Sequence, residues 1–344
     1  MHNALRIVAS PLIAALLIGA PAHIAFSEET TSPAAESGPA EPAASQVAAS
    51  GDLAGLVDIG GRRLYLACKG SGTPTVILEA GANNNGTIWS EVDPKAASKT
   101  SVFDGVAQFT RVCAYDRPGT IAGSETILRS RSDPAPMPRN ASDVVADLSA
   151  LLAAVGVRPS YVPVGHSFGG LAVRLFASTL PSDDVFGLVL VDAAQEEFWA
   201  KPEALVRPEQ WKGMIAAPPP PELADYHDFE RLDVDATAEE MRKAAAARPL
   251  SKLSLIVLSR GLPMELPPDA AAKLKANFSA EQERIWRTRQ YKLVALVPGA
   301  EHAVATKSGH YVQTMQPDLM IDAVLDVVEA VRWGSPVVVT PDRP

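Results

Sequence analysis

A tight glycine-rich turn lies between an apolar run and a helical run near the middle of the chain, and this junction limits the possible folds most. Residues 161–164 are largely apolar and lead directly into Gly-His-Ser-Phe-Gly at 165–169, and a helical pattern follows at 171–180. In a strand–turn–helix junction of this kind the flanking positions have no room for side chains, which explains the glycines. The pattern predicts that Ser167 projects from the C-terminal edge of a sheet, beside a helix N-terminus with its N–H groups and positive potential.

Strand-like and helix-like segments alternate over most of the chain. The run 185–191 is almost wholly apolar, as in a strand buried on both faces, whereas residues 140–155 carry apolar side chains at helical spacing. Such alternation predicts an α/β fold with a mostly parallel sheet and helices on both of its faces. We expect eight strands, at 53–59, 62–68, 75–79, 111–115, 161–165, 185–191, 253–258 and 300–306.

The alternation breaks between residues 193 and 250, and we interpret this segment as a cap inserted into a single domain that spans 52–340. It contains four consecutive prolines and an alanine-rich helical piece. Its aromatic residues Phe198, Trp199 and Trp211 would either line an apolar pocket or form the cap's own core.

The first 51 residues are predicted to lie outside this domain. Arg6 precedes an apolar run, and small residues follow it, so residues 1–27 are interpreted as an export signal. The alternative is an uncleaved anchor helix, although the run is short for a membrane span. Residues 28–51 are rich in Ala, Pro, Ser and Glu and are interpreted as a disordered linker. We therefore expect a periplasmic or secreted protein without a stable membrane anchor.

Composition bears on the partners of the chain. The net charge is −9 and no run of Lys and Arg exceeds two residues, so we expect no nucleic-acid partner. No two His or Cys residues stand at ligand spacing on one predicted element, and the glycines at 165–170 are explained by the turn. We therefore expect no metal and no cofactor, and a small-molecule substrate as partner, with the oligomeric state left open.

Ser167 would need a base within hydrogen-bond reach to act as a nucleophile, because a hydroxyl is weakly nucleophilic at neutral pH. Among the six histidines, His310 lies in a loop after the last predicted strand and before the closing helix, so it would arrive at the edge where Ser167 stands. His302 lies at the start of that strand, at the opposite end of the sheet. His310 is therefore the predicted base.

A carboxylate is expected to orient the imidazole of this base. Asp192 is the first choice, because it ends the buried run 188–191 at the edge of the sheet where the serine stands. Glu265, after the next strand, is the second choice, and Glu196 or Glu197 is the third. A purely structural role for Asp192, capping a helix at the entrance of the cap, stays open.

Two backbone N–H groups are expected to stabilise a developing oxyanion. One is that of Phe168, directly after the nucleophile. The other should come from the polar loop at 79–86, after the third strand, and we assign it to Ala82 with Asn83 as the alternative. A plain polar turn would also explain this loop.

Residues 53–333 resemble the α/β-hydrolase superfamily. The resemblance rests on five motifs in family order: Leu-Glu-Ala-Gly at 78–81, Tyr-Asp-Arg-Pro-Gly at 115–119, Gly-His-Ser-Phe-Gly-Gly at 165–170, Leu-Val-Leu-Val-Asp at 188–192 and Ser-Gly-His at 308–310. Many relatives have His-Gly where this chain has Ala80-Gly81, and many carry the acid after the strand that here ends at Ser259, although some carry it where Asp192 stands. The second strand neighbours the fourth in this superfamily, so the resemblance implies a disulfide between Cys68 and Cys113.

The resemblance implies a serine esterase that cleaves carboxylic ester bonds through a Ser-His-Asp triad and an acyl-enzyme. Perhydrolysis, lactone or amide hydrolysis and acyl transfer can use the same triad and stay open. A catalytically inactive binding protein on this scaffold is the alternative from a different class.

Overall fold

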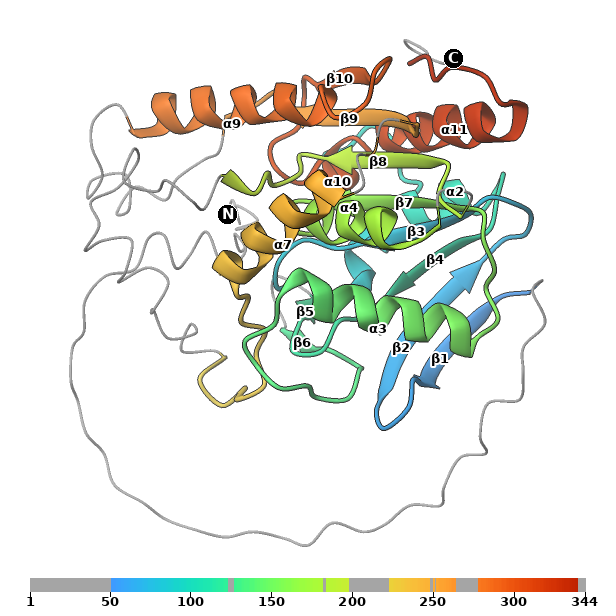
Figure 1. Cartoon of the computed structure of the whole chain (residues 1–344), viewed down its shortest axis with the longest axis vertical. Helices are drawn as coiled ribbons and strands as arrows, with labels where there is room; N and C mark the ends of the chain where they lie inside the picture. Colours follow the sequence, from blue (N-terminus) through green and yellow to red (C-terminus); the bar gives the residue numbers. More distant parts are fainter. Residues whose placement is uncertain are drawn as a thin grey trace, which may run out of the picture.

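The centre of the molecule is one eight-stranded sheet with the order β1-β2-β4-β3-β7-β8-β9-β10 (Figure 1). The structure is a computed structural model that describes residues 51–122, 127–181, 184–197, 223–247, 250, 252–263 and 278–339. The strands are β1 (Leu53–Asp58), β2 (Arg63–Lys69), β3 (Thr75–Glu79), β4 (Val112–Tyr115), β7 (Tyr161–His166), β8 (Gly187–Val191), β9 (Ser254–Arg260) and β10 (Glu301–Ala305).

Strand direction in this sheet is mostly parallel, as the alternation of elements predicted. β2 pairs antiparallel with β1 and with β4, and each later pair of neighbours is parallel. The predicted hairpin between β1 and β2 is present, and both residues of its Gly60-Gly61 turn have positive φ values that favour glycine. Because β3 lies between β4 and β7, the loop that follows β3 reaches the edge where β7 ends.

Helices cover both faces of the sheet, and side chains of the central strands alternate between apolar clusters on the two faces. Ile77 of β3 packs in the cluster that contains the apolar faces of α3 and α4, whereas Val76 and Leu78 pack in the cluster beneath α2 and α11. A third cluster joins β8 and β9 to α9. The helices are α2 (Val102–Val106), α3 (Ala141–Ala154), α4 (Gly169–Thr179), α7 (Val234–Ala247), α9 (Phe278–Val294), α10 (Val312–Met315) and α11 (Pro317–Trp333), with a 3₁₀ turn at η1 (Gly86–Ser90).

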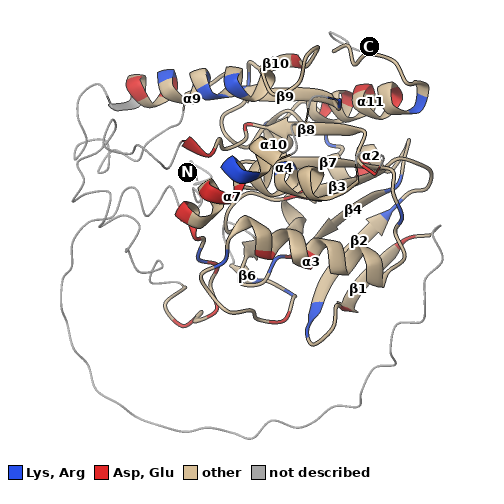
Figure 2. Cartoon of the chain, viewed as in Figure 1, with Lys and Arg blue, Asp and Glu red and all other residues tan. Residues whose placement is uncertain are grey.

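The helix ends follow from local sequence. Asn140 and Asp143 form a reciprocal capping box at the start of α3, and α11 begins at Pro317 and ends at Gly334, which has a left-handed backbone. Charged side chains lie mainly on the helices and loops, whereas the central strands are largely uncharged (Figure 2). Among the described residues, no helix combines the length and hydropathy needed to cross a membrane.

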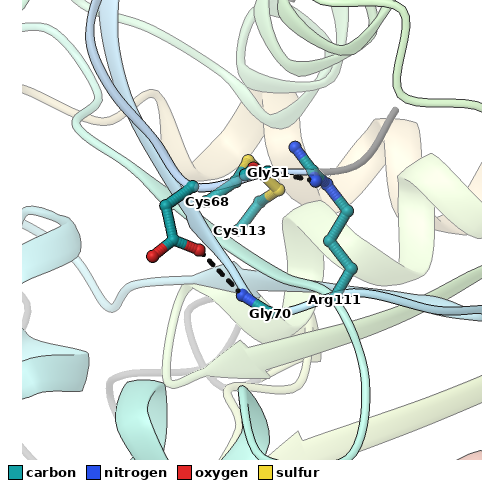
Figure 3. The surroundings of a disulfide bond; sticks show 6 residues. Gly51, Cys68, Gly70, Arg111 and Cys113 are labelled. Carbon is teal, nitrogen blue, oxygen red and sulfur yellow. Dashed lines mark hydrogen bonds between the residues drawn. A yellow bond between two sulfur atoms is a disulfide. The ribbon is translucent and has the colours of Figure 1, made fainter. Parts of the chain in front are cut away.

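The predicted disulfide between Cys68 and Cys113 is confirmed. The two residues face each other on the antiparallel strands β2 and β4, with their Cα atoms 4.1 Å apart, and both side chains are buried (Figure 3). Arg111 beside this bridge donates to the carbonyl of Gly51 at 3.0 Å. The bridge therefore joins the antiparallel edge of the sheet to its parallel centre.

The predicted cap is described in part. Residues 193–197, 223–247 and 250 are among the described residues, whereas 198–222 and the interpreted signal at 1–27 lie outside them. Helix α7 packs on α3 and α4 through Met241, and the Thr237 hydroxyl accepts from the N–H of Ala141 at the start of α3. A short two-stranded ribbon, β5 (Ile121–Ala122) and β6 (Leu128–Arg129), lies outside the main sheet.

Candidate active site

Ser167 lies between the end of β7 and the start of α4 and has a left-handed backbone, with φ of 51°. A non-glycine residue is uncommon in this conformation, which often occurs where function requires it. The Ser167 N–H donates to the carbonyl of Val191 at 3.1 Å, and its own carbonyl accepts from Gly170 at 3.0 Å and from Ala194 at 2.9 Å. These bonds hold the turn from both β8 and α4, so the half-buried serine side chain is fixed at the strand end, as predicted.

The glycines around Ser167 are required by close packing. A Cβ atom on Gly165 would lie 2.5 Å from the carbonyl oxygen of Gly169, and one on Gly169 would lie 2.5 Å from the carbonyl oxygen of Glu79. A Cβ on Gly170 would lie 2.4 Å from the Cβ of Ala193. The expectation that no side chain fits at these positions is therefore confirmed.

His310 and Asp192 are brought together across 118 residues of sequence. His310 Nδ1 lies 2.6 Å from Asp192 Oδ2 and donates to it, and the Asp192 side chain is fully buried. Asp192 directly follows β8 and also has a left-handed backbone, with φ of 39°. The two residues that chain order had singled out thus form a hydrogen-bonded pair beside the end of β7.

Two further side chains donate to the carboxylate of Asp192, and so does the backbone N–H of Arg260. The indole Nε1 of Trp286 donates to Oδ1 at 2.7 Å, and Arg260 Nη1 donates to Oδ2 at 2.8 Å. Burial alone would raise the pKa of Asp192, but the charge of Arg260 and the hydrogen bond from His310 outweigh it and hold the pKa well below its usual range. The carboxylate is therefore ionised at neutral pH.

Arg260 is itself balanced by a second acid. Its Nη2 donates to Glu283 Oε1 at 2.7 Å, and its guanidinium lies 4.6 Å from the centroid of the Trp286 ring. These contacts of Asp192 were not predicted. The position of Arg260 follows from the pairing of its strand. β8 and β9 are parallel neighbours in which Val191 pairs with Leu258, so Asp192 and Arg260 both lie at the edge where these strands end. No sequence signal pointed to Trp286 on α9.

His166, directly before Ser167, contacts the loop that holds His310. Its Nε2 lies 2.9 Å from the carbonyl oxygen of His310, so this nitrogen carries the proton and donates. The two imidazole centroids are 4.6 Å apart. Burial lowers the pKa of His166 to about 3, so the ring is neutral at physiological pH. This hydrogen bond joins the loop of His310 to the turn that holds Ser167.

The loop after β3 passes against the serine. A Cβ on Gly81 would lie 3.2 Å from the Cβ of Ser167, so the segment that holds Ala82 is next to the turn. The N–H of Asn83 donates to Glu230 Oε2 at 2.6 Å, so this alternative donor is directed at a carboxylate. Phe168 stands at the N-terminal cap position of α4, where the first N–H groups of a helix have no partner within the helix.

The other candidate residues are engaged in different contacts or are not described. Glu196 pairs with Arg174 at 2.8 Å, Glu197 pairs with Lys292 at 2.5 Å, and His302 Nε2 lies 2.7 Å from the hydroxyl of Ser259. Outside the described residues lie Glu265, Phe198, Trp199 and Trp211. Within the part of the chain that the structure describes, no group of three His, Cys, Asp or Glu side chains could hold a metal ion.

Comparison with known proteins gives one family and several distant relatives. A family model described as the alpha/beta hydrolase family matches residues 76–323. The chain is 28% identical over 213 residues to the probable transporter efuK of Hormonema carpetanum, a match that covers 55% of this chain but only 28% of that protein. It is 25% identical over 262 residues to the uncharacterized protein YqjL of Bacillus subtilis (strain 168), covering 75% of this chain and 85% of that protein.

Among solved structures, the chain is similar to the haloalkane dehalogenase DatA of Agrobacterium tumefaciens C58. The TM-score is 0.51 with 15% sequence identity, and the match covers 82% of this chain and 97% of that chain. At this identity the likeness shows the fold alone.

Proposed function

The chain belongs to the alpha/beta hydrolase family, and from that premise we propose that it is a serine hydrolase that cleaves carboxylic esters through Ser167, His310 and Asp192. The observation that carries the proposal is the 2.6 Å hydrogen bond from His310 Nδ1 to the buried carboxylate of Asp192. The imidazole of His310 also lies against that of His166, the residue directly before Ser167. These two contacts support the proposal, because triad chemistry requires a nucleophile, a base and an orienting acid at one edge of the sheet.

In the first half of the reaction Ser167 attacks the carbonyl carbon of the ester. As the Oγ–C bond forms, His310 Nε2 accepts the hydroxyl proton, and Asp192 stabilises the resulting imidazolium through Nδ1. The carbonyl oxygen becomes an oxyanion, which the backbone N–H groups of Phe168 and Ala82 stabilise. The tetrahedral intermediate then collapses, His310 returns the proton to the departing alkoxide, and an alcohol and an acyl-enzyme remain.

In the second half a water molecule takes the place of the alcohol. His310 removes a proton from the water as its oxygen attacks the acyl carbon, and the same two N–H groups stabilise the second oxyanion. Collapse breaks the bond to Ser167 Oγ, which recovers its proton from His310, and a carboxylic acid leaves. The depressed pKa of Asp192 supports this scheme, because an ionised acid is available to stabilise the imidazolium in both halves.

A serine nucleophile distinguishes this proposal from other chemistry on the same fold. Epoxide hydrolases and haloalkane dehalogenases of this fold attack the substrate with a carboxylate, whereas the residue in the turn between β7 and α4 is here Ser167. The likeness to a haloalkane dehalogenase therefore carries no argument for dehalogenation.

The test is hydrolysis of p-nitrophenyl acetate, butyrate and octanoate by wild type, Ser167→Ala and a matched control, Ser178→Ala. Ser178 lies near the C-terminal end of α4, the helix that follows Ser167, and donates to the carbonyl of Arg174, away from the turn. We expect Ser167→Ala to lose activity by about 10⁴-fold or more and the control to keep it. Activity retained in Ser167→Ala would refute the nucleophile.

A fluorophosphonate probe separates the remaining alternatives. Wild type that labels at Ser167 but leaves all three esters intact would exclude these esters and direct assays to amides, lactones or peracids. Wild type that neither hydrolyses nor labels would refute the hydrolase and favour a binding protein.

We also propose that the protein acts outside the cytoplasm after removal of residues 1–27. The disulfide between Cys68 and Cys113 supports this proposal, because such bonds persist mainly in oxidising compartments. Fractionation of the producing cells and N-terminal sequencing of the protein test it. Full-length protein found in the cytoplasm would contradict it.

A further inference from the structure

A buried ion cluster lies beneath the loop after β3, apart from the contacts of His310 and Asp192. The Arg117 side chain is 1% exposed and binds two carboxylates, Glu79 and Glu230, which are also buried. Burial alone would lower the pKa of Arg117, but the two carboxylates outweigh it and raise the pKa, so the guanidinium keeps its charge. The catalytic scheme above uses none of these three charges.

Arg117 also binds the loop itself, through two consecutive carbonyl groups. Its Nη1 donates to the carbonyl oxygen of Ala80 and its Nη2 to that of Gly81, each at 2.8 Å. A trans peptide is planar, so the C=O of Gly81 and the N–H of Ala82 point in opposite directions. By holding the Gly81 oxygen, the guanidinium turns the Ala82 N–H away from itself, within the segment that passes against Ser167.

Glu230 holds the same loop from the other side of Ala82. Its Oε2 accepts from the N–H of Asn83 at 2.6 Å, and its carbonyl accepts from Asn83 Nδ2 at 2.9 Å. The carboxylate also binds Arg117 in a bidentate manner, at 2.7 Å from Nε and 3.0 Å from Nη2. Asn83 has a left-handed backbone with φ of 62°, which these bonds maintain. The peptide before Ala82 and the residue after it are therefore fixed by one ion pair.

We propose that Arg117, clamped by Glu230 from the cap segment, is a positioning residue that holds the Ala82 N–H in the direction needed to stabilise the oxyanion. The inference rests on the proposed serine-hydrolase function. Glu230 lies within the predicted cap at 193–250, and its N–H donates to the carbonyl of Gly119 at 2.8 Å. A carboxylate of the cap segment thereby helps to position the oxyanion donor.

The test compares Arg117→Lys and Glu230→Gln with Arg174→Lys as the matched control. Arg174 is a similarly buried arginine, on α4, that pairs with Glu196 at 2.8 Å. A lysine at 117 is a point charge and cannot hold two carbonyls and a bidentate carboxylate together. We expect Arg117→Lys to lower kcat for p-nitrophenyl butyrate by about 10- to 100-fold with KM within about twofold, because oxyanion contacts form only in the transition state.

A trifluoromethyl ketone gives the decisive readout, because its serine adduct carries an oxyanion. Its affinity should fall by the same factor as kcat/KM in Arg117→Lys, by about 3- to 10-fold in Glu230→Gln, and within twofold in the control. A folded Arg117→Lys with wild-type kcat, or with unchanged inhibitor affinity, overturns the proposal. If that variant does not fold, unchanged inhibitor affinity in Glu230→Gln overturns it.

Hydrogen exchange of residues 80–86 separates this inference from the proposed function. If wild type neither hydrolyses esters nor labels with fluorophosphonate, the proposed serine-hydrolase function is refuted. Faster exchange of the loop in Glu230→Gln than in the control would still support the clamp, and equal exchange would overturn it.

Discussion

The carboxylate of Asp192 accepts hydrogen bonds from three side chains at once, so replacing one of its oxygens is expected to have a large effect. In Asp192→Asn the amide nitrogen cannot accept. At the position of Oδ2 it removes the acceptor shared by His310 and Arg260, and at the position of Oδ1 it removes the acceptor of Trp286. We expect kcat to fall by about 10³- to 10⁴-fold, because the imidazole takes the wrong tautomer. The measurement is kcat on p-nitrophenyl butyrate together with Tm.

The control for this substitution is Asp147→Asn. Asp147 is a buried acid of α3 that pairs with Arg62 and Arg139. This variant should lose stability and keep its kcat. An Asp192→Asn enzyme with nearly wild-type kcat would exclude Asp192 as the acid.

The buried ring of His166 makes the stability of the folded protein depend on pH. The pKa of this buried ring is about 3 in the folded protein and about 6.5 in an unfolded chain, so the unfolded state binds more protons as the pH falls. Stability should therefore decrease from pH 6.5 downward and level off near pH 3. Between pH 7 and pH 5 the contribution of His166 is about 2 kcal/mol, from 1.36 kcal/mol per pH unit below 6.5.

Urea unfolding at the two pH values tests this linkage. His166→Gln should lose about 2 kcal/mol less than wild type on acidification. His227→Gln, a change at an exposed histidine, should behave as wild type does. An equal loss in wild type and His166→Gln would show that the ring is protonated in the folded state.

The sequence could predict those site residues whose position at the edge of the sheet follows from the order of strands along the chain. His310 and Asp192 each follow a strand of the sheet, so strand order brought them to one edge, and the structure pairs them. Trp286 and Glu283 contact this site from α9, and their approach depends on how that helix packs, which no local pattern encodes. The register of β7, β8 and β9 places Arg260 and His166 at the edge of the sheet where Ser167 stands. It does not indicate which groups these two side chains bind.

At the scale of elements, the junction of β7 and α4 depends on glycines that a methyl group would disrupt. A Cβ on Gly165 would lie 2.5 Å from both the Gly169 oxygen and Val173 Cγ2. We expect Gly165→Ala to destabilise the fold by about 1–3 kcal/mol, as overpacking does, and to lower kcat by displacing Ser167. Denaturant unfolding and ester hydrolysis measure the two effects.

Gly55→Ala serves as the matched substitution in a strand. Gly55 lies in β1, and a Cβ there would have no neighbour within 4 Å. This variant should be neutral or more stable by up to about 1 kcal/mol, because alanine restricts the unfolded chain. Equal losses in both variants would mean that packing at the turn is not the cause.

The elements that the sequence predicted are those with a clear period. The run at 185–191 corresponds to β8 at Gly187–Val191, and the pattern at 140–155 corresponds to α3 at Ala141–Ala154. The ribbon of β5 and β6 was not predicted, because each strand has only two residues and therefore shows no alternation. Helix α2, with five residues, is likewise too short to display a helical period.

At the scale of the whole molecule, alternation predicted a parallel sheet but did not determine its order. The family resemblance implied one neighbour pair, the second strand beside the fourth, and the pairing of β2 with β4 allows Cys68 to meet Cys113. The placement of β3 between β4 and β7 was not predicted, and it brings the loop after β3 to Ser167. Two neighbour relations of β4 and β3 therefore underlie the covalent link and the candidate site.

The disulfide should contribute to global stability without affecting the reaction. It closes a loop with a sequence separation of 45 residues, for which restriction of the unfolded chain gives about 4 kcal/mol at most. We expect Cys68→Ala/Cys113→Ala to lose about 2–4 kcal/mol in urea unfolding. Because β3 separates the bridged strands from β7, kcat at 25 °C should stay within twofold of wild type.

Reduced wild type distinguishes the covalent link from the packing of the two side chains. Both cysteines are buried, so reduction should require unfolding, and the reduced chain should show the same loss in stability as the double variant. A smaller loss on reduction would assign the remainder to the cavities that alanine leaves. Thiol titration of unfolded, unreduced protein should find no reactive thiol. Two reactive thiols would refute the bridge and, with it, the support that the bridge gives to an oxidising compartment.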